Sequence, residues 1–407
     1  MSQPLNRNFR LLWLGQATSV LGDRVHQLAV LWWVLNHSGS PALVGAVMVA
    51  TSVPVVLVGP FAGAIADRVD RRRLMLTCDL VRMVLVALMA FLAFQGLLTV
   101  PLVLALSVLL SAVGALFTPA SMAMVPEVVP PEQMLRANSL QELTTQGAGI
   151  LGPALGGALV AALGAQAAFG LNALTFLVSA IVLLAMRHQP GPMPASGESY
   201  WQTLAGGAAI LRERPGIASL LASFAIANLF LAPIPVLLPV FAKDVFHAGA
   251  SGLGMLEGTL GAGMIVAALV LARRGDVSRK VALISGSFVL QGAMMLMMAL
   301  RPSFYGFGVG LAVLGGALSA LNIVVVAAFQ RSIPGEQLGR FMGLLTAIVL
   351  GVMPLSYALV GVLATRVPPE RLLLASGMAL ALVGLGLLGM PGVRDLERHV
   401  IPGSNPS

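Results

Sequence analysis

One apolar stretch near the N-terminus carries an acidic residue at its centre. Asp23 lies about midway between Trp13 and Trp32. A helix joining the two tryptophans would be roughly 28 Å long, close to the hydrocarbon thickness of a bilayer. Because tryptophan favours the two membrane interfaces, Asp23 is expected near the midplane, where a carboxyl group can do proton chemistry.

The polar residues around Asp23 share one helical face. Gln16, Ser19, Asp23 and Gln27 follow a spacing of i, i+3, i+7 and i+11, which places them in a single stripe. Such a stripe is costly against lipid. We therefore expect these four side chains to line a central cavity for a substrate or a proton.

Asp23 has two interpretations. Loss of water at the midplane favours the protonated carboxyl group, so Asp23 is expected to take up and release a proton. Arg24 would oppose this if the two side chains paired, but neighbouring residues point about 100° apart on a helix. The alternative is an ion pair that only locks this helix to its neighbour.

Three further polar residues lie in apolar stretches of the second half. Glu257 is expected to join Asp23 in a cavity between the halves; its alternative is a hydrated position at a rim. Asn228 and Asn322 are predicted to line the same cavity, or else to hydrogen-bond between helices.

The elements that position these residues are membrane helices. The chain is 57% hydrophobic and 10% charged, unlike a soluble domain. Its repeated long apolar runs predict an all-α polytopic membrane protein with twelve transmembrane helices in two six-helix bundles. The predicted spans are 10–35, 41–66, 74–97, 101–124, 138–162, 166–187, 216–241, 251–273, 281–300, 303–328, 340–365 and 371–390.

The net charge of +8 is distributed as membrane topology requires. Most Lys and Arg residues fall in the two termini and in alternate loops, which predicts that both termini are cytoplasmic. The pattern argues against a nucleic-acid partner. We expect a monomeric, multi-pass protein of a bacterial inner membrane, with the lipid bilayer and a small molecule as partners.

The chain divides into two related halves. We predict an N-terminal bundle at 1–187, a cytoplasmic linker with an amphipathic helix at 188–214, and a C-terminal bundle with a short tail at 215–407. Segments 130–140 and 334–344 carry the same residue at five of eleven positions. Repeated halves of this kind are typical of secondary transporters.

A dense charge cluster ends the second predicted span. Gly59, Gly63 and Asp67 are spaced four apart and share one helical face. The two glycines allow another helix to approach closely, and Asp67 would meet that helix at the membrane surface. The arginines that follow are expected on the cytoplasmic side.

This loop resembles the signature between helices 2 and 3 of the major facilitator superfamily of secondary transporters. The residues that match the pattern are Gly63, Asp67, Arg68, Arg71 and Arg72. Asp70 stands where the family usually has glycine. The resemblance implies a cytoplasmic gate that closes against span 11.

Three other charged residues are predicted to belong to that gate. Asp79 and Arg82 follow the arginine cluster at the start of the third span, and Glu142 begins the fifth. Ion pairs between bundles can form in one state and break in another. The alternative is that all three are solvated or paired interface charges.

The fifth span contains a glycine- and proline-rich element. Its residues are Gly149, Gly152, Pro153, Gly156 and Gly157. It resembles an element of antiporter branches of the superfamily, which implies export. Pro153 removes a backbone hydrogen bond and the glycines permit close packing, so a hinge is expected here.

The N-terminal residues 6–16 and 19–23, with Pro126-Glu127, resemble the bacterial branch that holds macrolide-efflux proteins and enterobactin exporters. That resemblance implies a proton-coupled exporter of drugs or siderophores working by alternating access; uptake by the same fold is the alternative. No nucleotide-binding loop or zinc motif is present in the sequence, so we expect no enzymatic activity and no cofactor, with a proton gradient as the energy source.

Overall fold

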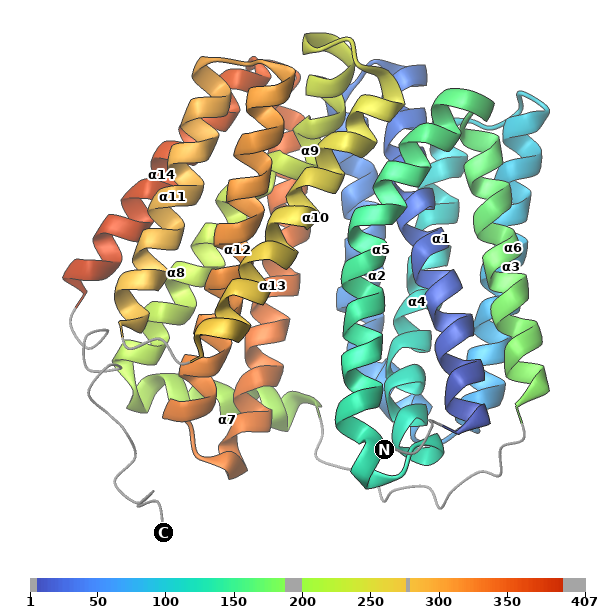
Figure 1. Ribbon diagram of the computed structural model, residues 1–407, viewed down its shortest axis with the longest axis horizontal. Coiled ribbons are helices and arrows are strands. Elements are labelled where there is room, and N and C mark those ends of the chain that lie inside the picture. Colours follow the sequence, from blue (N-terminus) through green and yellow to red (C-terminus); the bar gives the residue numbers. More distant parts are fainter. Residues whose placement is uncertain (1–5, 187–199, 276–278, 391–407) are drawn as a thin grey trace. The chain divides into compact units, whose positions relative to one another are not determined.

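The computed structural model describes residues 6–186, 200–275 and 279–390. Predictions for the end of the N-terminal tail, for linker residues 188–199 and for the tail at 391–407 lie outside the described residues. Every regular element in the described part is helical, with no strand (Figure 1). The predicted all-α fold is confirmed.

The chain forms two compact units, and the first contains the N-terminal helices together with Ala242–Gly258. Its helices, named in chain order, are α1 (Arg7–Ser38), α2 (Pro41–Ala66), α3 (Arg71–Phe94), α4 (Val100–Val128), the short 3-10 turn η1 (Pro131–Gln133), α5 (Met134–Leu163) and α6 (Ala165–Ala185).

The second unit contains Glu198–Phe241 and the chain from Thr259 onward. The remaining elements are α7 (Tyr200–Glu213), α8 (Pro215–Leu231), α9 (Pro233–Val240), the π-helical turn η2 (Phe241–Val245), α10 (Gly249–Arg274), α11 (Lys280–Leu300), α12 (Phe304–Ser332), α13 (Gly335–Leu363) and α14 (Pro369–Gly389). Helix α7, part of the predicted linker, lies across the ends of the long helices of its unit (Figure 1) and packs on α13.

Eleven spans among the described residues are long and apolar enough to cross a membrane. Helix α1 is not one of them, and it carries Asp23 and Arg24 near its middle. At 32 residues it is nevertheless about 48 Å long, more than the hydrocarbon layer requires. The predicted number of twelve spans therefore stays a prediction.

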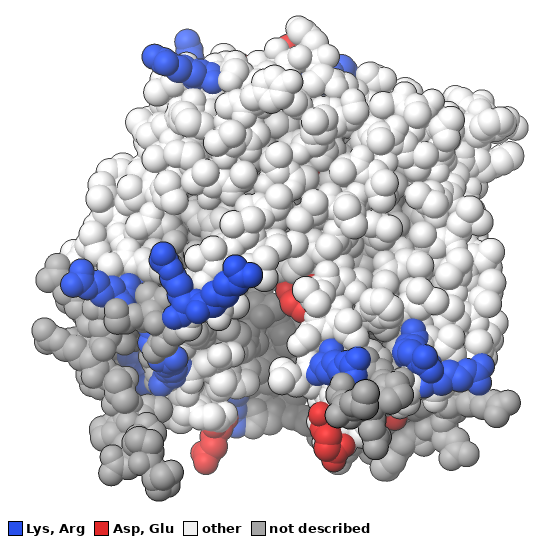
Figure 2. All heavy atoms as spheres, viewed as in Figure 1, with Lys and Arg blue, Asp and Glu red and all other residues white. Residues whose placement is uncertain are grey.

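The surface agrees with burial in lipid. On the face shown in Figure 2, Lys and Arg gather in the lower half, and the upper half is almost free of charge below its top edge. Numerous large apolar side chains are exposed, including Phe61, Phe94 and Leu135. Uncharged apolar surface of this extent is stable against lipid and not against water.

Small residues let α1 pack closely within the first unit. A Cβ added at Gly15 would lie 3.3 Å from the Ser179 hydroxyl of α6, and one added at Gly22 would collide with Asn172 and Thr175. On another side of α1, Gly156 of α5 lies against the Val25 backbone, where an added Cβ would be 3.1 Å from Val25 Cα. These contacts fix which side chains α1 can present to the interior of the unit.

Candidate functional site

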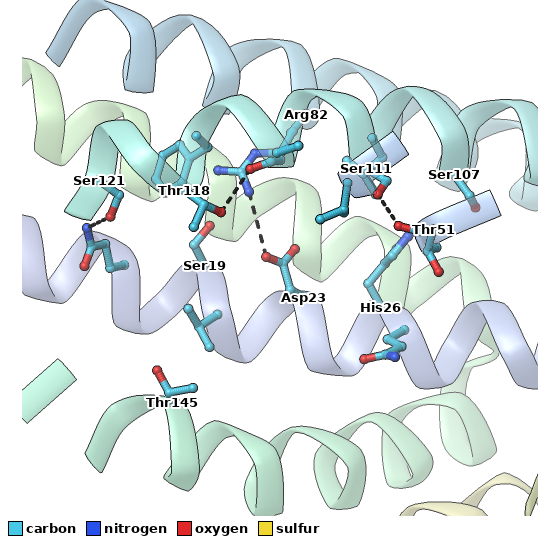
Figure 3. A pocket seen from close by; sticks show the side chains of 18 of the residues that line it. Ser19, Asp23, His26, Thr51, Arg82, Ser107, Ser111, Thr118, Ser121 and Thr145 are labelled. Atoms are coloured by element: carbon cyan, nitrogen blue, oxygen red, sulfur yellow. Dashed lines mark hydrogen bonds and ion pairs between the residues drawn. The ribbon is translucent and has the colours of Figure 1, made fainter. Parts of the chain in front are cut away.

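The first unit contains an open cavity of about 600 Å³ (Figure 3). Its wall is formed by α1, α2, α4 and α5, and α3 contributes Arg82. The titratable, charged and amide side chains along it include Gln16, Asp23, His26, Gln27, Arg82 and Gln141. The cavity is large enough for a drug-sized molecule.

The polar stripe predicted on the first span lies along this cavity. Gln16, Ser19, Asp23 and Gln27 all belong to its lining. Gln16 donates to the Ser121 hydroxyl of α4 and accepts from the Gln141 amide of α5 at 2.9 Å. The stripe thus faces other helices of the same unit.

Asp23 pairs with a residue that sequence reasoning did not assign to it. Its Oδ2 lies 3.8 Å from Arg82 Nη1 of α3, and its Oδ1 accepts from Asn172 Nδ2 of α6 at 3.4 Å. Both contacts are long for a charge-assisted hydrogen bond. The Asp23 side chain is 43% exposed, so its oxygens remain accessible from the cavity (Figure 3).

Arg82 is held mainly by a second carboxylate. Its Nη2 donates to Asp79 Oδ1, one turn earlier on α3, and Ser179 Oγ donates to Asp79 Oδ2 at 2.6 Å. Asp79 is completely buried. The guanidinium carbon of Arg82 lies 4.2 Å from the centre of the Phe117 ring and 4.4 Å from that of Phe176, an arrangement that favours a cation.

The positions of Asp79 and Arg82 differ from those expected of exposed gate charges, and their role in gating stays a prediction. The sequence suggested gate residues near a helix end that pair between bundles. In the structure both are buried; they pair with each other, and Arg82 also pairs with Asp23, all inside the first unit. The reason is packing: α3 places them against α1 and α6, where a charge must be paired to be tolerated.

Three buried polar atoms of the cavity wall have no hydrogen-bond partner among the described residues: Ser19 Oγ, His26 Nδ1 and Arg82 Nε. His26 packs on the Phe169 ring at 5.2 Å between centroids. Because buried polar groups are usually satisfied, these three atoms are unusual, but each is almost inaccessible to solvent and could bond a molecule in the cavity only after a side-chain movement.

Arg24 and Glu257 lie away from the cavity lining. Arg24 donates to Gln27 at 3.3 Å, and its Cβ occupies the space beside Gly152 of α5. Glu257 is half-buried and belongs to the part of α10 in the first unit. No ion pair between Asp23 and Arg24 occurs in the described residues.

The two asparagines of the second half do not line this cavity either. Asn228, on α8, donates to the Phe224 carbonyl of its own helix at 2.8 Å. Asn322, on α12, is half-buried. Their predicted role as cavity lining stays a prediction.

The arginine-rich loop after α2 joins three helices of the first unit. Arg71 pairs with Asp67 at 3.6 Å and with Glu127 of α4. Arg72 donates to the Leu183 and Leu184 carbonyls at 2.6 and 2.8 Å, satisfying the last turn of α6.

The other predicted gate residues make few contacts. Apart from its chain neighbours and the backbone of its own helix, a Cβ added at Gly59 or at Gly63 would meet no described atom within 4 Å. Arg68 is exposed, and so is Glu142, whose carboxylate accepts from Gln146 at 2.8 Å. Their role in gating stays a prediction.

Glycines of the predicted hinge in α5 make close helix contacts, and the hinge itself stays a prediction. Gly152 and Gly156 contact α1, and an added Cβ at Gly157 would lie 3.0 Å from Gly254 Cα, a residue of the first unit. Pro153 is buried in an uninterrupted helix. Gly149 has open space around it.

The whole chain matches one protein family. Residues 2–402 match the family described as transmembrane secretion effector, MFS_3. The chain belongs to this family. Its resemblance to the major facilitator superfamily is thereby confirmed, and the chain is a multi-pass membrane transporter.

Relatives of this MFS_3 chain include efflux proteins. Macrolide efflux protein A of Streptococcus pyogenes is 25% identical over 398 residues, covering 96% of this chain and 97% of that protein. Multidrug efflux pump Tap of Mycolicibacterium fortuitum is 26% identical over 398 residues, covering 95% and 96%. These are similarities across nearly the full length of each protein.

Solved structures support the fold of the MFS_3 chain. A bacterial homologue of the iron transporter ferroportin, crystallised in its inward-facing state, superimposes with a TM-score of 0.74 at 18% identity and covers 95% of this chain and 99% of that one. Identity at this level concerns the fold alone. In the described part of this chain, no group of three or more His, Cys, Asp or Glu side chains is arranged to hold a metal ion.

Proposed function

We propose that this transporter exports small amphiphilic molecules by alternating access and draws its energy from the proton gradient. The observation that carries the proposal is the accessible carboxylate of Asp23 in a drug-sized cavity. Relatives named for macrolide and multidrug efflux support the direction of transport.

The charges at the cavity favour a cationic substrate. Asp23, Asp79 and Arg82 together carry one more negative than positive charge when both carboxyl groups are ionised. A proton or an organic cation can supply the missing positive charge, and each would exclude the other. Competition for one carboxylate couples outward transport of a cation to inward movement of protons, provided that the unoccupied transporter does not change its facing.

The remaining wall suits the apolar body of such a molecule. Its apolar side chains include Val20, Leu31, Met48, Val55, Leu110 and Phe117. Hydroxyl groups of α4, among them Ser121 and Thr118, lie along the same wall (Figure 3). An apolar lining with a few polar groups is typical of small-molecule sites.

An anionic substrate such as a siderophore is less well supported. Arg24, the residue on which that alternative depended, does not line the cavity. Arg82 does, but its charge is already matched by carboxylates. The cavity thus lacks a free cation in its described lining.

Reconstitution into proteoliposomes tests the proposal. Ethidium, a fixed-charge apolar cation, should accumulate against its gradient when a pH gradient is imposed and should equilibrate passively in Asp23→Asn. Glu370→Gln, a carboxylate change in the first turn of α14, is the matched control and should transport normally.

Other results would contradict the proposal. Full gradient-driven transport by Asp23→Asn would remove Asp23 from the coupling step. Accumulation in the direction of proton flow would identify an uptake transporter of the same fold. We further propose an inner-membrane location with both termini cytoplasmic, which the Lys and Arg distribution supports.

A further inference from the structure

Arg82 faces two carboxylates, and it binds them unequally. Asp79 is 0% exposed and accepts from both Arg82 and Ser179. Asp23 is 43% exposed, and its nearest oxygen is 3.8 Å from the guanidinium. One cation is thus held tightly by the deeper carboxylate and loosely by the one at the cavity.

We propose that Asp79 is a positioning residue that retains the charge of Arg82, so that Asp23 stays available to an organic cation. This inference rests on the proposed function. Neither Asp79 nor Ser179 lines the cavity. The inference nevertheless gives these two residues control over what binds at Asp23.

The surroundings of Arg82 leave its guanidinium little freedom. The rings of Phe117 and Phe176 lie within 4.4 Å of its Cζ, and a planar guanidinium between two rings can turn only within narrow limits. Its Nη2 is engaged by Asp79, and its Nη1 points to Asp23. A small rotation or shift would exchange the preferred carboxylate.

Removal of the Asp79 charge should cause that exchange. A buried guanidinium without a close carboxylate is strongly unfavourable. In Asp79→Asn, the only other carboxylate paired with Arg82 in the described residues is Asp23. Arg82 would close on Asp23 and neutralise it, so cation binding would fall even though Asp23 is intact.

Binding of tetraphenylphosphonium to the purified full-length protein in nanodiscs tests this step. We expect Asp79→Asn and Asp23→Asn each to weaken binding by about tenfold or more, the range for loss of one close charge partner. In Asp79→Asn/Arg82→Gln the competing cation is removed together with its partner. This double variant should return to within about threefold of wild type, and adding Asp23→Asn to it should abolish the recovery.

The rescue separates positioning from a structural role. If Asp79 only stabilised the fold, the double variant would bind no better than Asp79→Asn, and that outcome would overturn the proposal. Binding by Asp79→Asn at the wild-type level would overturn it as well. If Asp79→Asn fails to fold, Ser179→Ala serves instead: it removes one of the hydrogen bonds that hold Asp79 and should weaken binding partially, with recovery on adding Arg82→Gln. Unchanged binding by Ser179→Ala would then overturn the proposal.

Failure of the proposed function gives a different result. If Asp23→Asn binds tetraphenylphosphonium like wild type, the site of cation binding is elsewhere and the proposed function fails at its first step. A second result is that Asp23→Asn loses binding and Asp79→Asn/Arg82→Gln binds no better than Asp79→Asn. In that case only the role of Asp79 is refuted.

Discussion

Arg71, the first residue of α3, forms an ion pair with Glu127 in the last turn of α4. Both side chains are largely buried, at 14% and 17% exposure. The pair therefore ties the charged loop after α2 to a helix 56 residues further along the chain. The loop has a structural role within the first unit, in addition to any role in gating.

The Arg71–Glu127 pair should contribute to stability. Glu127→Gln keeps the shape of the side chain and one acceptor but removes the charge. We expect a loss of about 1.5 kcal/mol, the lower end of the range for a hydrogen bond to a charged group because glutamine keeps one acceptor, seen as a lower thermal unfolding midpoint of the purified protein. Glu142→Gln, an exposed carboxylate, should leave the midpoint unchanged; equal midpoints for both variants would contradict the assignment.

Asp70 stands where the superfamily pattern usually has glycine, and the structure gives this residue a role of its own. It is the N-cap of α3, and its Oδ1 accepts from the Arg73 amide at 2.8 Å. A negative carboxylate at this position also interacts favourably with the positive end of the helix dipole. The residue that replaces the usual glycine therefore starts the helix that carries Asp79 and Arg82.

Substitutions at Asp70 should rank by capping ability. Asp70→Ala should cost about 1 kcal/mol of stability, whereas Asp70→Asn and Asp70→Gly should each cost only a few tenths. Thermal unfolding of the three variants checks the order. If alanine proved no worse than glycine, the cap would not be contributing.

Apolar periodicity and length located most helices correctly from the sequence. The predicted span 41–66 coincides with α2, and 74–97 overlaps α3. The predicted span 216–241 is divided in the structure into α8, α9 and the start of η2. Pro233 and Pro239 lie in this segment, and each removes a backbone donor that a continuous helix would use.

The stripe around Asp23 was recognisable because its four members lie on one helix. A second stripe on α4 was also readable and was missed: Ser107, Ser111, Thr118 and Ser121 line the cavity at spacings of i, i+4, i+11 and i+14, which is one helical face. The partners of Asp23 could not be read in this way. Arg82 and Asn172 reach it from α3 and α6, and helical spacing says nothing about which helices pack together.

Replacement by alanine should have opposite effects on stability at two glycines of neighbouring helices, Gly22 of α1 and Gly63 of α2. Gly22→Ala places a methyl group against Asn172 and Thr175 and should cost about 1–3 kcal/mol through overpacking. It should also reduce transport, because Asn172 bonds Asp23. A thermally stable Gly22→Ala with normal transport would show that α1 and α6 can separate without consequence.

Gly63→Ala is the matched comparison and tests the predicted gate. With no described atom near the new methyl group, stability should stay equal or rise by up to about 1 kcal/mol from improved helix propensity. If Gly63 serves close helix approach during gating, ethidium transport should fall while the unfolding midpoint does not. Unaltered transport would argue against a gating role for this glycine.

Arg82→Lys retains the positive charge and removes the planar fork. A lysine has a single ammonium group, so it cannot keep separate nitrogens on Asp79 and near Asp23 between two aromatic rings. We expect the ammonium to bind the buried Asp79, which leaves Asp23 without its contact at 3.8 Å. Gradient-driven ethidium transport in proteoliposomes should then persist, because a proton and ethidium still compete for Asp23, and tetraphenylphosphonium binding to the purified variant should be retained or become tighter. Loss of both activities together in a folded variant would indicate that Arg82 is required to form the cavity and would contradict its role as an exchangeable partner of Asp23.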